Sequence, residues 1–524
     1  MPVAVSYPGL YLEELASNAH SIVAAPTSIA VFVGYSHPFK TDAATFGKPI
    51  RLSSFSEYER TFGGIYISSA LDCNLGHAVY QFFLNGGSDA YVVGLKASYR
   101  IVGGAPQTIA AATQTLATTG GGIVFTAKEV TDHPDTALTV TISNVRTSGA
   151  AGNPLDLADY TLTYGTRVET YRGVPLGTPG FNALNKASSL ISITPSGGGY
   201  GTAYAGAIVA PISLVTVLPA ALAGTFSATD FTAVFQADQP LDKVQIFNLL
   251  IVPGVSDNGV LSAALAFAER KQAFTIMDPP ANCGADTDVA VPANDMSAVF
   301  QSGAIPLSAN GALYFPFLKT SNPLNGKPLN LPPSGFVAGI FARIDTRRGV
   351  WKAPAGLEAI VLNTTGVVDS GKMTDPRQGV LNLTGINCLR TFPGLGTVVF
   401  GARTLVSANV AFQDNKYVPV RRMTLFLEQT LLQNLKWIVF EPNDEPLWLA
   451  IRMTIENFML SLFNQQALQG SKPSEAFQVK CDRTTTTPDD QANGIVNIVV
   501  AFAPLKPAEF VIIKIAHLAG QTQS

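Results

Sequence analysis

Apolar residues along this chain alternate between short runs typical of buried strands and longer runs with helical spacing. Residues 29–34, Ile-Ala-Val-Phe-Val-Gly, form an apolar run of strand length, and residues 75–84 have the spacing of a helix that ends at Asn85-Gly-Gly. Residues 91–94 predict the next strand. The alternation resumes with a strand at 244–252, a helix at 261–272 and a strand at 273–277. These segments predict an α/β domain whose two parts are separated in the sequence.

The intervening residues, about 101–239, are rich in Thr, Gly, Ala and Val and contain short alternating runs such as Leu138-Thr-Val-Thr-Ile-Ser. This pattern predicts a β-rich insertion, a sandwich or barrel-like module that faces outward. Residues 205–224 are apolar enough to suggest a membrane span. Pro211, Pro219 and many small polar residues favour strands and turns instead, so we expect no membrane insertion.

The C-terminal part predicts two helices. The first is apolar over most of its surface and leaves a narrow polar strip of Gln429, Gln433 and Lys436. The second has Asp444 as its expected N-cap and Gly470 as its expected stop. Three strands are predicted after them, at 476–481, 495–503 and 510–515.

The last of these strands has apolar side chains on both faces: Phe510, Val511, Ile512, Ile513 and Ile515. A free strand of this kind aggregates edge to edge unless another strand pairs with it. The partner can belong to the same subunit or to a neighbour, and the residues alone leave both alternatives open. At the other end of the chain Val3, Val5 and Tyr7 alternate as in a strand until Pro8-Gly breaks the pattern.

The composition indicates a subunit of an assembly. A chain of 524 residues is expected to form two to four domains. Only 14% of its residues are charged, against about 25% in typical soluble domains, so we expect much of the surface to lie against other protein. The net charge of −3 gives no overall basic field for nucleic acid.

No cofactor, metal site or disulfide framework is predicted. The four cysteines, Cys73, Cys283, Cys388 and Cys481, lie far apart without a C-x-x-C pair. The N-terminus shows no secretory signal, so we expect a protein made in the cytoplasm and kept there unless lysis releases it.

The sequence also predicts no catalytic site. The five histidines are scattered, and the nucleophile-elbow, dinucleotide and zinc-protease motifs are missing. Residues 366–373 resemble a phosphate loop, but Met373 replaces the hydroxyl residue that contacts magnesium, and Thr374-Asp-Pro-Arg is not expected to begin a helix. A turn is the simpler prediction.

Two charged clusters have simple interpretations. Glu441, Asp444 and Glu445 lack the ligand spacing of a calcium loop and suit helix capping. Arg343, Arg347, Arg348 and the nearby Lys352 favour protein contacts or salt bridges within a domain over phosphate binding.

Several long segments resemble contractile tail sheath proteins. Residues 417–423, 435–448 and 494–515 are similar to the C-terminal domain of that family, residues 7–14 resemble its opening arm, and residues 339–355 resemble its middle signature. The resemblance covers roughly residues 1–100 and 240–524 and leaves the insertion outside it.

Together, pattern and resemblance predict an α/β and α+β multidomain protein: an α/β sheath core with a β-rich insertion, and a C-terminal α+β domain with extended linking strands at both ends. The expected parts are an N-terminal arm at 1–25, the α/β domain at 26–100 and 240–345, and the outer insertion at 101–239. An inner C-terminal domain at 346–504 and a C-terminal linking strand at 505–524 complete the chain.

The resemblance implies a structural subunit, not an enzyme, that polymerises helically around an inner tube and contracts to drive the tube through a target envelope. Implied partners are further copies in stacked hexameric rings, the tube protein, and baseplate and cap proteins, within a phage tail or a tail-like particle. Val3, Val5, Tyr7 and the apolar residues 510–515 are the expected linking strands. Arg421, Arg422 and Lys436 are the expected tube-facing residues. A static shell or adhesin protein and a nucleotide-dependent α/β enzyme are the alternatives.

Overall fold

The chain folds into two compact units in a computed structural model that describes residues 21–70, 73–97, 99–100, 106–107, 109–118, 121–133, 136–146, 156–196, 211–218, 226–281, 283, 296–368 and 373–515. The C-terminal unit comprises Met1–Pro26, Gly349–Lys352 and Arg422–Ser524, and the α/β unit comprises Thr27–Arg348 and Ala353–Arg421. Val3, Val5 and Tyr7 of the expected N-terminal strand lie outside the described residues.

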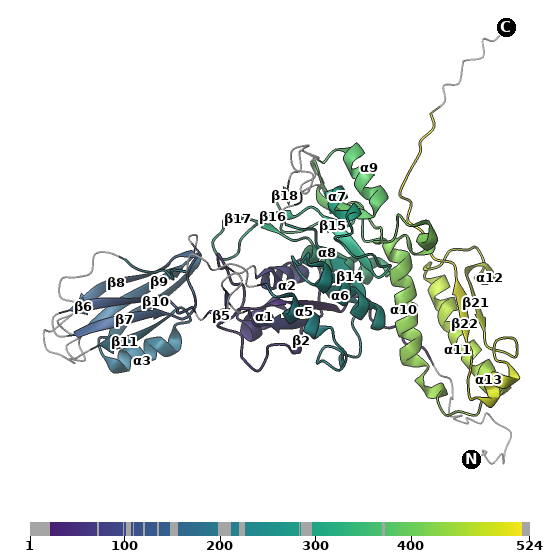
Figure 1. Ribbon diagram of the computed structural model, residues 1–524, viewed down its shortest axis with the longest axis horizontal. Coiled ribbons are helices and arrows are strands. Elements are labelled where there is room, and N and C mark those ends of the chain that lie inside the picture. The colour runs from purple at the N-terminus through teal and green to yellow at the C-terminus, as the bar shows by residue number, and fades with distance from the viewer. Residues whose placement is uncertain are drawn as a thin grey trace, which may run out of the picture. The chain divides into compact units, whose positions relative to one another are not determined.

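An eight-stranded sheet organises the α/β unit (Figure 1), with the strand order β2-β3-β1-β13-β14-β15-β19-β20. The edge strands β2 and β20 are antiparallel to their neighbours, and the strands between them are parallel. Parallel strands are covered on both faces, which is why β1, Ala-Val-Phe-Val-Gly-Tyr, is apolar and buried throughout. The strands are β1 Ala30–Tyr35, β2 Pro49–Leu52, β3 Ala90–Leu95, β13 Leu249–Ile251, β14 Phe274–Met277, β15 Gly311–Phe315, β19 Ile386–Phe392 and β20 Gly396–Val399.

Helices connect and cover these strands. Asp257 begins α6 by accepting a hydrogen bond from the backbone N–H of Val260 at 2.9 Å. Helices α2 and α8 pack closely because Gly335 has no side chain, and an added Cβ there would lie 2.6 Å from the Cα of Ala78. The helices are α1 Phe55–Phe62, α2 Asn74–Leu84, α5 Ala228–Val234, α6 Asn258–Arg270, α7 Met296–Gln301, α8 Ser334–Arg348, α9 Asp375–Thr384 and the 3-10 helix η4 Val410–Asn415. A small sheet adds β16 Leu318–Ser321, β17 Pro328–Leu331 and β18 Gly366–Val367.

Between β3 and β13 the chain leaves the large sheet and forms the insertion, which has a β-sandwich-like pair of sheets and its own apolar core around Phe125, Tyr160 and Phe181. Strict alternation of buried and half-buried residues along β9 explains why one face of its sheet covers this core. The sheets have the orders β10-β9-β8-β12 and β11-β7-β6, beside a short β4-β5 pair. The elements are β4 Tyr99–Arg100, β5 Pro106–Gln107, β6 Thr113–Thr118, β7 Gly121–Ala127, β8 Leu138–Arg146, β9 Leu157–Tyr164, β10 Arg167–Pro175, α3 Thr178–Ala187, β11 Ile191–Ser196 and β12 Ile212–Leu214.

The C-terminal unit packs two long helices against a two-stranded antiparallel sheet, β21-β22. Asp444 caps the second helix, as predicted, by accepting a hydrogen bond from the N–H of Leu447 at 3.1 Å. The three tryptophans of the chain, Trp351, Trp437 and Trp448, all belong to this unit. Its elements are α10 Val418–Asn434, which begins just before the boundary between the units, the 3-10 helix η5 Lys436–Ile438, α11 Glu445–Asn464, α12 Pro473–Ala476, β21 Phe477–Lys480, α13 Pro488–Ala492 and β22 Val499–Phe502.

The described end of the N-terminal arm lies along α10. The backbone N–H of Val23 donates to the Asn434 side chain at 2.9 Å, and the Asn434 amide donates back to the carbonyl of Val23 at 2.8 Å. The N–H of Ala25 donates to the Thr430 hydroxyl at 3.2 Å. Residues 23–25 are therefore anchored within the C-terminal unit.

The structure corrects two local predictions. Thr374-Asp-Pro-Arg does begin a helix, α9, because Thr374 is extended at the N-cap and Pro376 fits the first turn, where no N–H is needed. The second C-terminal helix ends at Asn464 instead of Gly470, since Gln466 adopts a left-handed φ of 59° and turns the chain. Residues 510–515, the predicted linking strand, have no strand partner among the described residues of this single chain, so their pairing with a neighbouring subunit stays a prediction.

Among the described residues, no helix has the length and apolar character required to cross a membrane.

Candidate assembly surfaces

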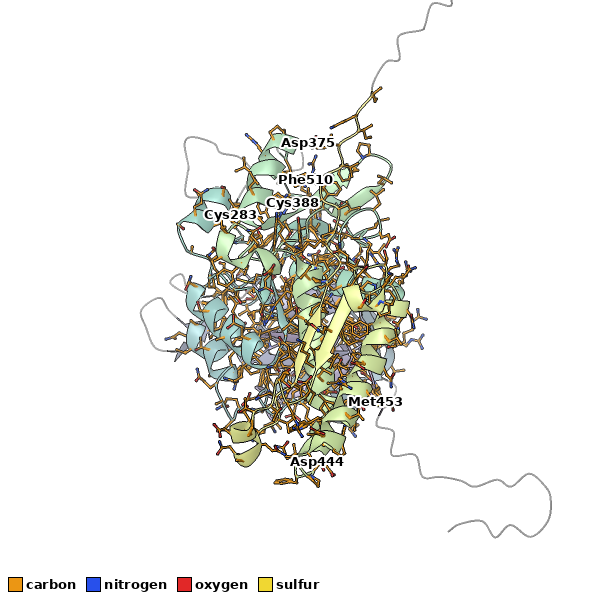
Figure 2. All side chains as sticks on the ribbon, turned by 90° about the vertical axis from the view of Figure 1, so that its right-hand side faces the viewer. Cys283, Asp375, Cys388, Asp444, Met453 and Phe510 are labelled. Carbon is orange, nitrogen blue, oxygen red and sulfur yellow. The ribbon has the colours of Figure 1, made fainter. Side chains whose placement is uncertain are left out.

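The C-terminal segment after β22 exposes a continuous set of large apolar side chains. Phe510, Val511, Ile512, Ile513 and Ile515 are each between 71% and 84% exposed. The segment has no secondary structure between Lys506 and Ile515, and its side chains extend outward from the trace (Figure 2). Exposed apolar residues that are scattered singly are common on protein surfaces, whereas five of them within six positions form a contiguous apolar patch.

An open sheet edge lies in the same unit. The N–H of Ala503 donates to the carbonyl of Ala476 at 2.8 Å, so these two residues form a hydrogen-bonded pair. Along antiparallel strands, residue pairs that exchange backbone hydrogen bonds alternate with pairs that do not. In the register Val479↔Val500 and Phe477↔Phe502, the backbone groups of Val500 and Phe502 therefore point away from β21. Among the described residues, β21 and β22 pair with each other and with no third strand. The sequence had predicted β22, but not which of its residues form this edge.

The three expected tube-facing residues have different surroundings. Arg421 is half-buried, and its Nε donates to the Asn310 side chain at 2.8 Å. Arg422 is 3% exposed. Lys436 is exposed and lies in η5, just beyond the helix to which the sequence assigned it.

The other charged clusters form contacts within the subunit. Asp444 caps α11, and Glu445 pairs with Arg483. Arg348 pairs with Glu358 at 2.6 Å, and Arg343 donates to backbone carbonyls of Asn85 and Ile360. Among the described residues no group of His, Cys, Asp or Glu is arranged to hold a metal ion. The centre of the phosphate-loop-like run, residues 369–372, lies outside the described residues.

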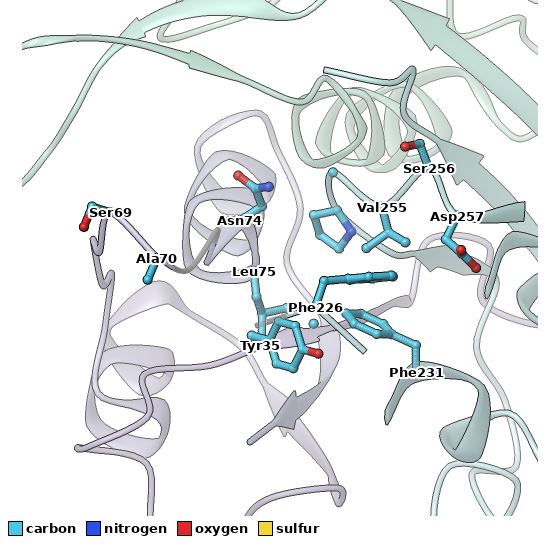
Figure 3. Close-up of a pocket in the computed structure, with 13 residues that line it drawn as sticks. Tyr35, Ser69, Ala70, Asn74, Leu75, Phe226, Phe231, Val255, Ser256 and Asp257 are labelled. Atoms are coloured by element: carbon cyan, nitrogen blue, oxygen red, sulfur yellow. The ribbon is translucent and has the colours of Figure 1, made fainter. Parts of the chain in front are cut away.

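A pocket of about 530 Å³ lies at the carboxyl ends of β1 and β13, where the strand order of the sheet reverses. Figure 3 shows the rings of Tyr35, Phe226 and Phe231 together on one side of it; the ring of Phe231 lies 5.1 Å from that of Tyr35 and 5.5 Å from that of Phe226. Asn74 and Asp257 are polar residues of its wall, and Asp257 is engaged in capping α6. Crevices of this kind bind ligands in many open α/β sheets. Among the described residues that line this pocket there is neither a buried unpaired polar group nor a cluster of charges.

Comparison with known proteins agrees with the sequence resemblance. The family described as phage tail sheath protein central domain matches residues 236–405, and the phage tail sheath C-terminal domain matches residues 411–516. The tail sheath protein of Salmonella phage ViI is 28% identical over 183 residues, which are 35% of this chain and 27% of that relative. The match thus spans little more than a quarter of the relative's length.

Solved structures share the fold over nearly the whole chain. A chain of the six-fold symmetrised baseplate of the anti-feeding prophage matches with a TM-score of 0.58 at 23% identity, over 98% of this chain and 99% of that one. The contracted sheath complex of the extracellular contractile injection system PVC matches with a TM-score of 0.59 at 21% identity, over 98% of both chains. Because the two sheath domains together match more than half of the sequence, this chain belongs to the phage tail sheath family.

Proposed function

We propose that this chain is the structural subunit of a contractile sheath, which polymerises helically around an inner tube and shortens to drive the tube through a target envelope. Family membership supports this proposal, as do relatives described as a tail sheath protein and as sheaths in a contracted state. The further partners we propose are baseplate and terminal cap proteins. Assembly in the cytoplasm as stacked hexameric rings, with release by lysis, completes the proposal.

The observation that carries the proposal is that one unit contains both an apolar extended segment and an open sheet edge. In strand addition, an extended segment of one chain pairs with the edge of a sheet in another, and backbone hydrogen bonds supply the affinity. Residues 510–515 of one subunit would pair with the edge at Val500 and Phe502 of a neighbour, or with an edge that the neighbour's N-terminal arm has extended. Each new backbone hydrogen bond contributes about 0.5–1.5 kcal/mol net.

Such contacts suit a sheath that contracts. A donor segment and an acceptor edge are different surfaces, so their pairing is head to tail, and it generates an open helix when successive copies do not close into a ring. Residues 505–509, Leu-Lys-Pro-Ala-Glu, connect β22 to the donor segment without secondary structure. Subunits can therefore rotate against one another while the strands stay paired, and contraction becomes a transition between two packings.

Of the three expected tube-facing residues, Arg422 is 3% exposed and Arg421 is half-buried with its Nε donating to Asn310, so the tube contact we propose uses Lys436. The Lys436 side chain is exposed in the subunit and gives the most direct contact with an acidic tube surface. Exposed charge pairs contribute only about 0–1 kcal/mol each, so a tube held in this way is free to slide once the sheath widens.

Deletion of residues 505–524 tests the function. We expect a folded subunit by circular dichroism and no striated rods by negative-stain microscopy. Deletion of residues 516–524 is the matched control, since it retains Phe510–Ile515, and should still give rods. Rods formed normally without residues 505–524 would disprove the role of this segment, and unstriated shells from the unmodified protein would favour the static alternative.

A further inference from the structure

Three contacts between the insertion and the α/β domain each involve a different segment of that domain, and the first is a buried charged cluster. Glu129, just after β7 of the insertion, lies 2.9 Å from Nε2 of His37 and 2.5 Å from Nζ of Lys40, both in the loop after β1. The side chains of His37 and Glu129 are 1% and 3% exposed. A buried carboxylate is costly unless it is paired, so separating the two partners leaves an uncompensated charge.

The second contact is a hydrogen-bonded carboxylate. Asp132 of the insertion accepts from the Ser68 hydroxyl at 3.0 Å and from the backbone N–H of Ser69 at 2.8 Å, and it also bonds the Ser69 hydroxyl. Ser68 and Ser69 lie in the loop between α1 and α2. This contact therefore involves a different loop of the α/β domain from the first.

The third contact lies on the β9–β10 hairpin. The N–H of Thr166 donates to the carbonyl of Leu324 at 2.5 Å, and its hydroxyl donates to the same carbonyl at 2.7 Å. Leu324 belongs to the connection between β16 and β17. Gly165 permits this approach, because a Cβ there would lie 2.3 Å from the Leu324 carbonyl oxygen.

We propose that these three contacts form a clamp that makes the insertion and the α/β domain one rigid body, so that the insertion keeps its orientation to the α/β sheet when the sheath contracts. Two chain crossings alone, before β6 and after β12, would form a hinge. Contacts to three different segments of the α/β domain fix rotation about every axis. When the α/β domain rotates during contraction, the insertion then rotates with it through the same angle.

Glycine substitutions on one hairpin test the clamp. Gly165→Ala places a methyl group against the Leu324 carbonyl, whereas the matched control Gly173→Ala has the same backbone strain, φ +61° against +60°, with nothing within 4 Å. In the full chain we expect Gly165→Ala to raise the amide exchange of Thr166 about tenfold or more, and Gly173→Ala to leave it nearly unchanged. Equal effects of the two substitutions would show that backbone strain, not the contact, governs protection and would overturn the clamp.

A second measurement addresses orientation directly. In cryo-electron microscopy of sheaths, the insertion of the unmodified protein should be as well resolved as the eight-stranded sheet. The combined variant Gly165→Ala, Asp132→Asn should blur the insertion and leave the sheet sharp, because the insertion retains a core of its own. An insertion that takes several orientations in unmodified sheaths, or that stays sharp in the combined variant, would refute the proposal.

Discussion

Nε2 of His37 lies 2.9 Å from Oε2 of Glu129, although 92 residues separate the two in sequence. The other ring nitrogen, Nδ1, faces the backbone N–H groups of Phe39 and Lys40 at 3.3 Å each and accepts from them. His37 is therefore neutral with its proton on Nε2, which donates to the Glu129 carboxylate. The positive charge that balances Glu129 comes from Lys40.

Acid should weaken this contact. Burial lowers the pKa of His37, although the hydrogen bond to Glu129 opposes the shift. Burial alone would raise the pKa of Glu129, but the hydrogen bond from His37 and the charge of Lys40 lower it to about 2. Both side chains bind protons more readily in the unfolded chain, so stability falls as pH drops below about 6.5 for His37, and below about 4.5 for Glu129.

The measurement for this prediction is hydrogen exchange in residues 128–133, corrected for the intrinsic rate, at pH 7, 5.5 and 4. Protection should decline with each step. In Glu129→Gln, which loses the carboxylate, it should be lower at pH 7 and change less with pH. Constant protection of the unmodified protein over this range would contradict the assignment. Further ionisable groups lie beside this pair: Lys40 and Arg167 near His37, Tyr66 with its ring 4.7 Å from that of His37, and Tyr164 near Glu129.

Asp444→Ala should destabilise the C-terminal unit by about 0.5–2 kcal/mol through loss of the α11 N-cap. Because Trp351, Trp437 and Trp448 all lie in this unit, the tryptophan fluorescence midpoint in urea reports its unfolding selectively. Asp444→Ser, which keeps a capping oxygen, is the control and should recover most of the loss. An unchanged midpoint in the alanine variant would show that the cap contributes nothing measurable.

Lys436→Glu should reduce co-assembly with the inner tube without affecting folding, since its side chain is exposed. Arg421→Glu should instead destabilise the α/β unit by about 1–3 kcal/mol, because it removes the donor to Asn310. Pelleting of sheath with tube at low salt, together with thermal melts, separates the two effects. Full tube occupancy in Lys436→Glu would exclude this lysine as a tube contact.

Excision of residues 105–225 with a short linker should still permit sheath formation, because the eight-stranded sheet uses no strand from the insertion and α5, with its buried Phe231, stays in the α/β unit. His37 and Lys40 then become accessible to water, so losing their partner costs little. We expect striated rods that lack an outer layer by negative stain. A folded subunit that forms no rods would make the insertion part of the lattice.

Strongly periodic segments of the fold could be predicted from sequence, and contacts between remote segments could not. The buried run of β1 and the apolar stripe of α11 after Asp444 carry their structure locally. The end of α11 was missed because Gln466, not glycine, takes the left-handed turn there. Nothing in the sequence around His37 indicates a partner in the insertion, since the pairing depends on how the two domains meet.

The assembly surfaces, too, could be predicted only in part from the sequence. The apolar character of residues 510–515 is visible in the sequence, and the structure adds that they are exposed. The backbone edge at Val500 and Phe502 follows from the register with β21, which no property of those two side chains encodes. The burial of Arg422 could not be predicted from sequence either, because arginine side chains are exposed more often than they are buried.

A subunit that carries both a donor segment and an open acceptor edge can pair with other copies before sheath assembly has begun. Before assembly, newly made chains expose both the donor segment and the acceptor edge. At high concentration such chains can therefore aggregate or pair into dimers that do not extend into a sheath. Ordered growth therefore requires a starting template that presents the first acceptor edge, and slow spontaneous nucleation away from it. In production of the isolated protein, chains without residues 505–524 should give the higher yield of monomer.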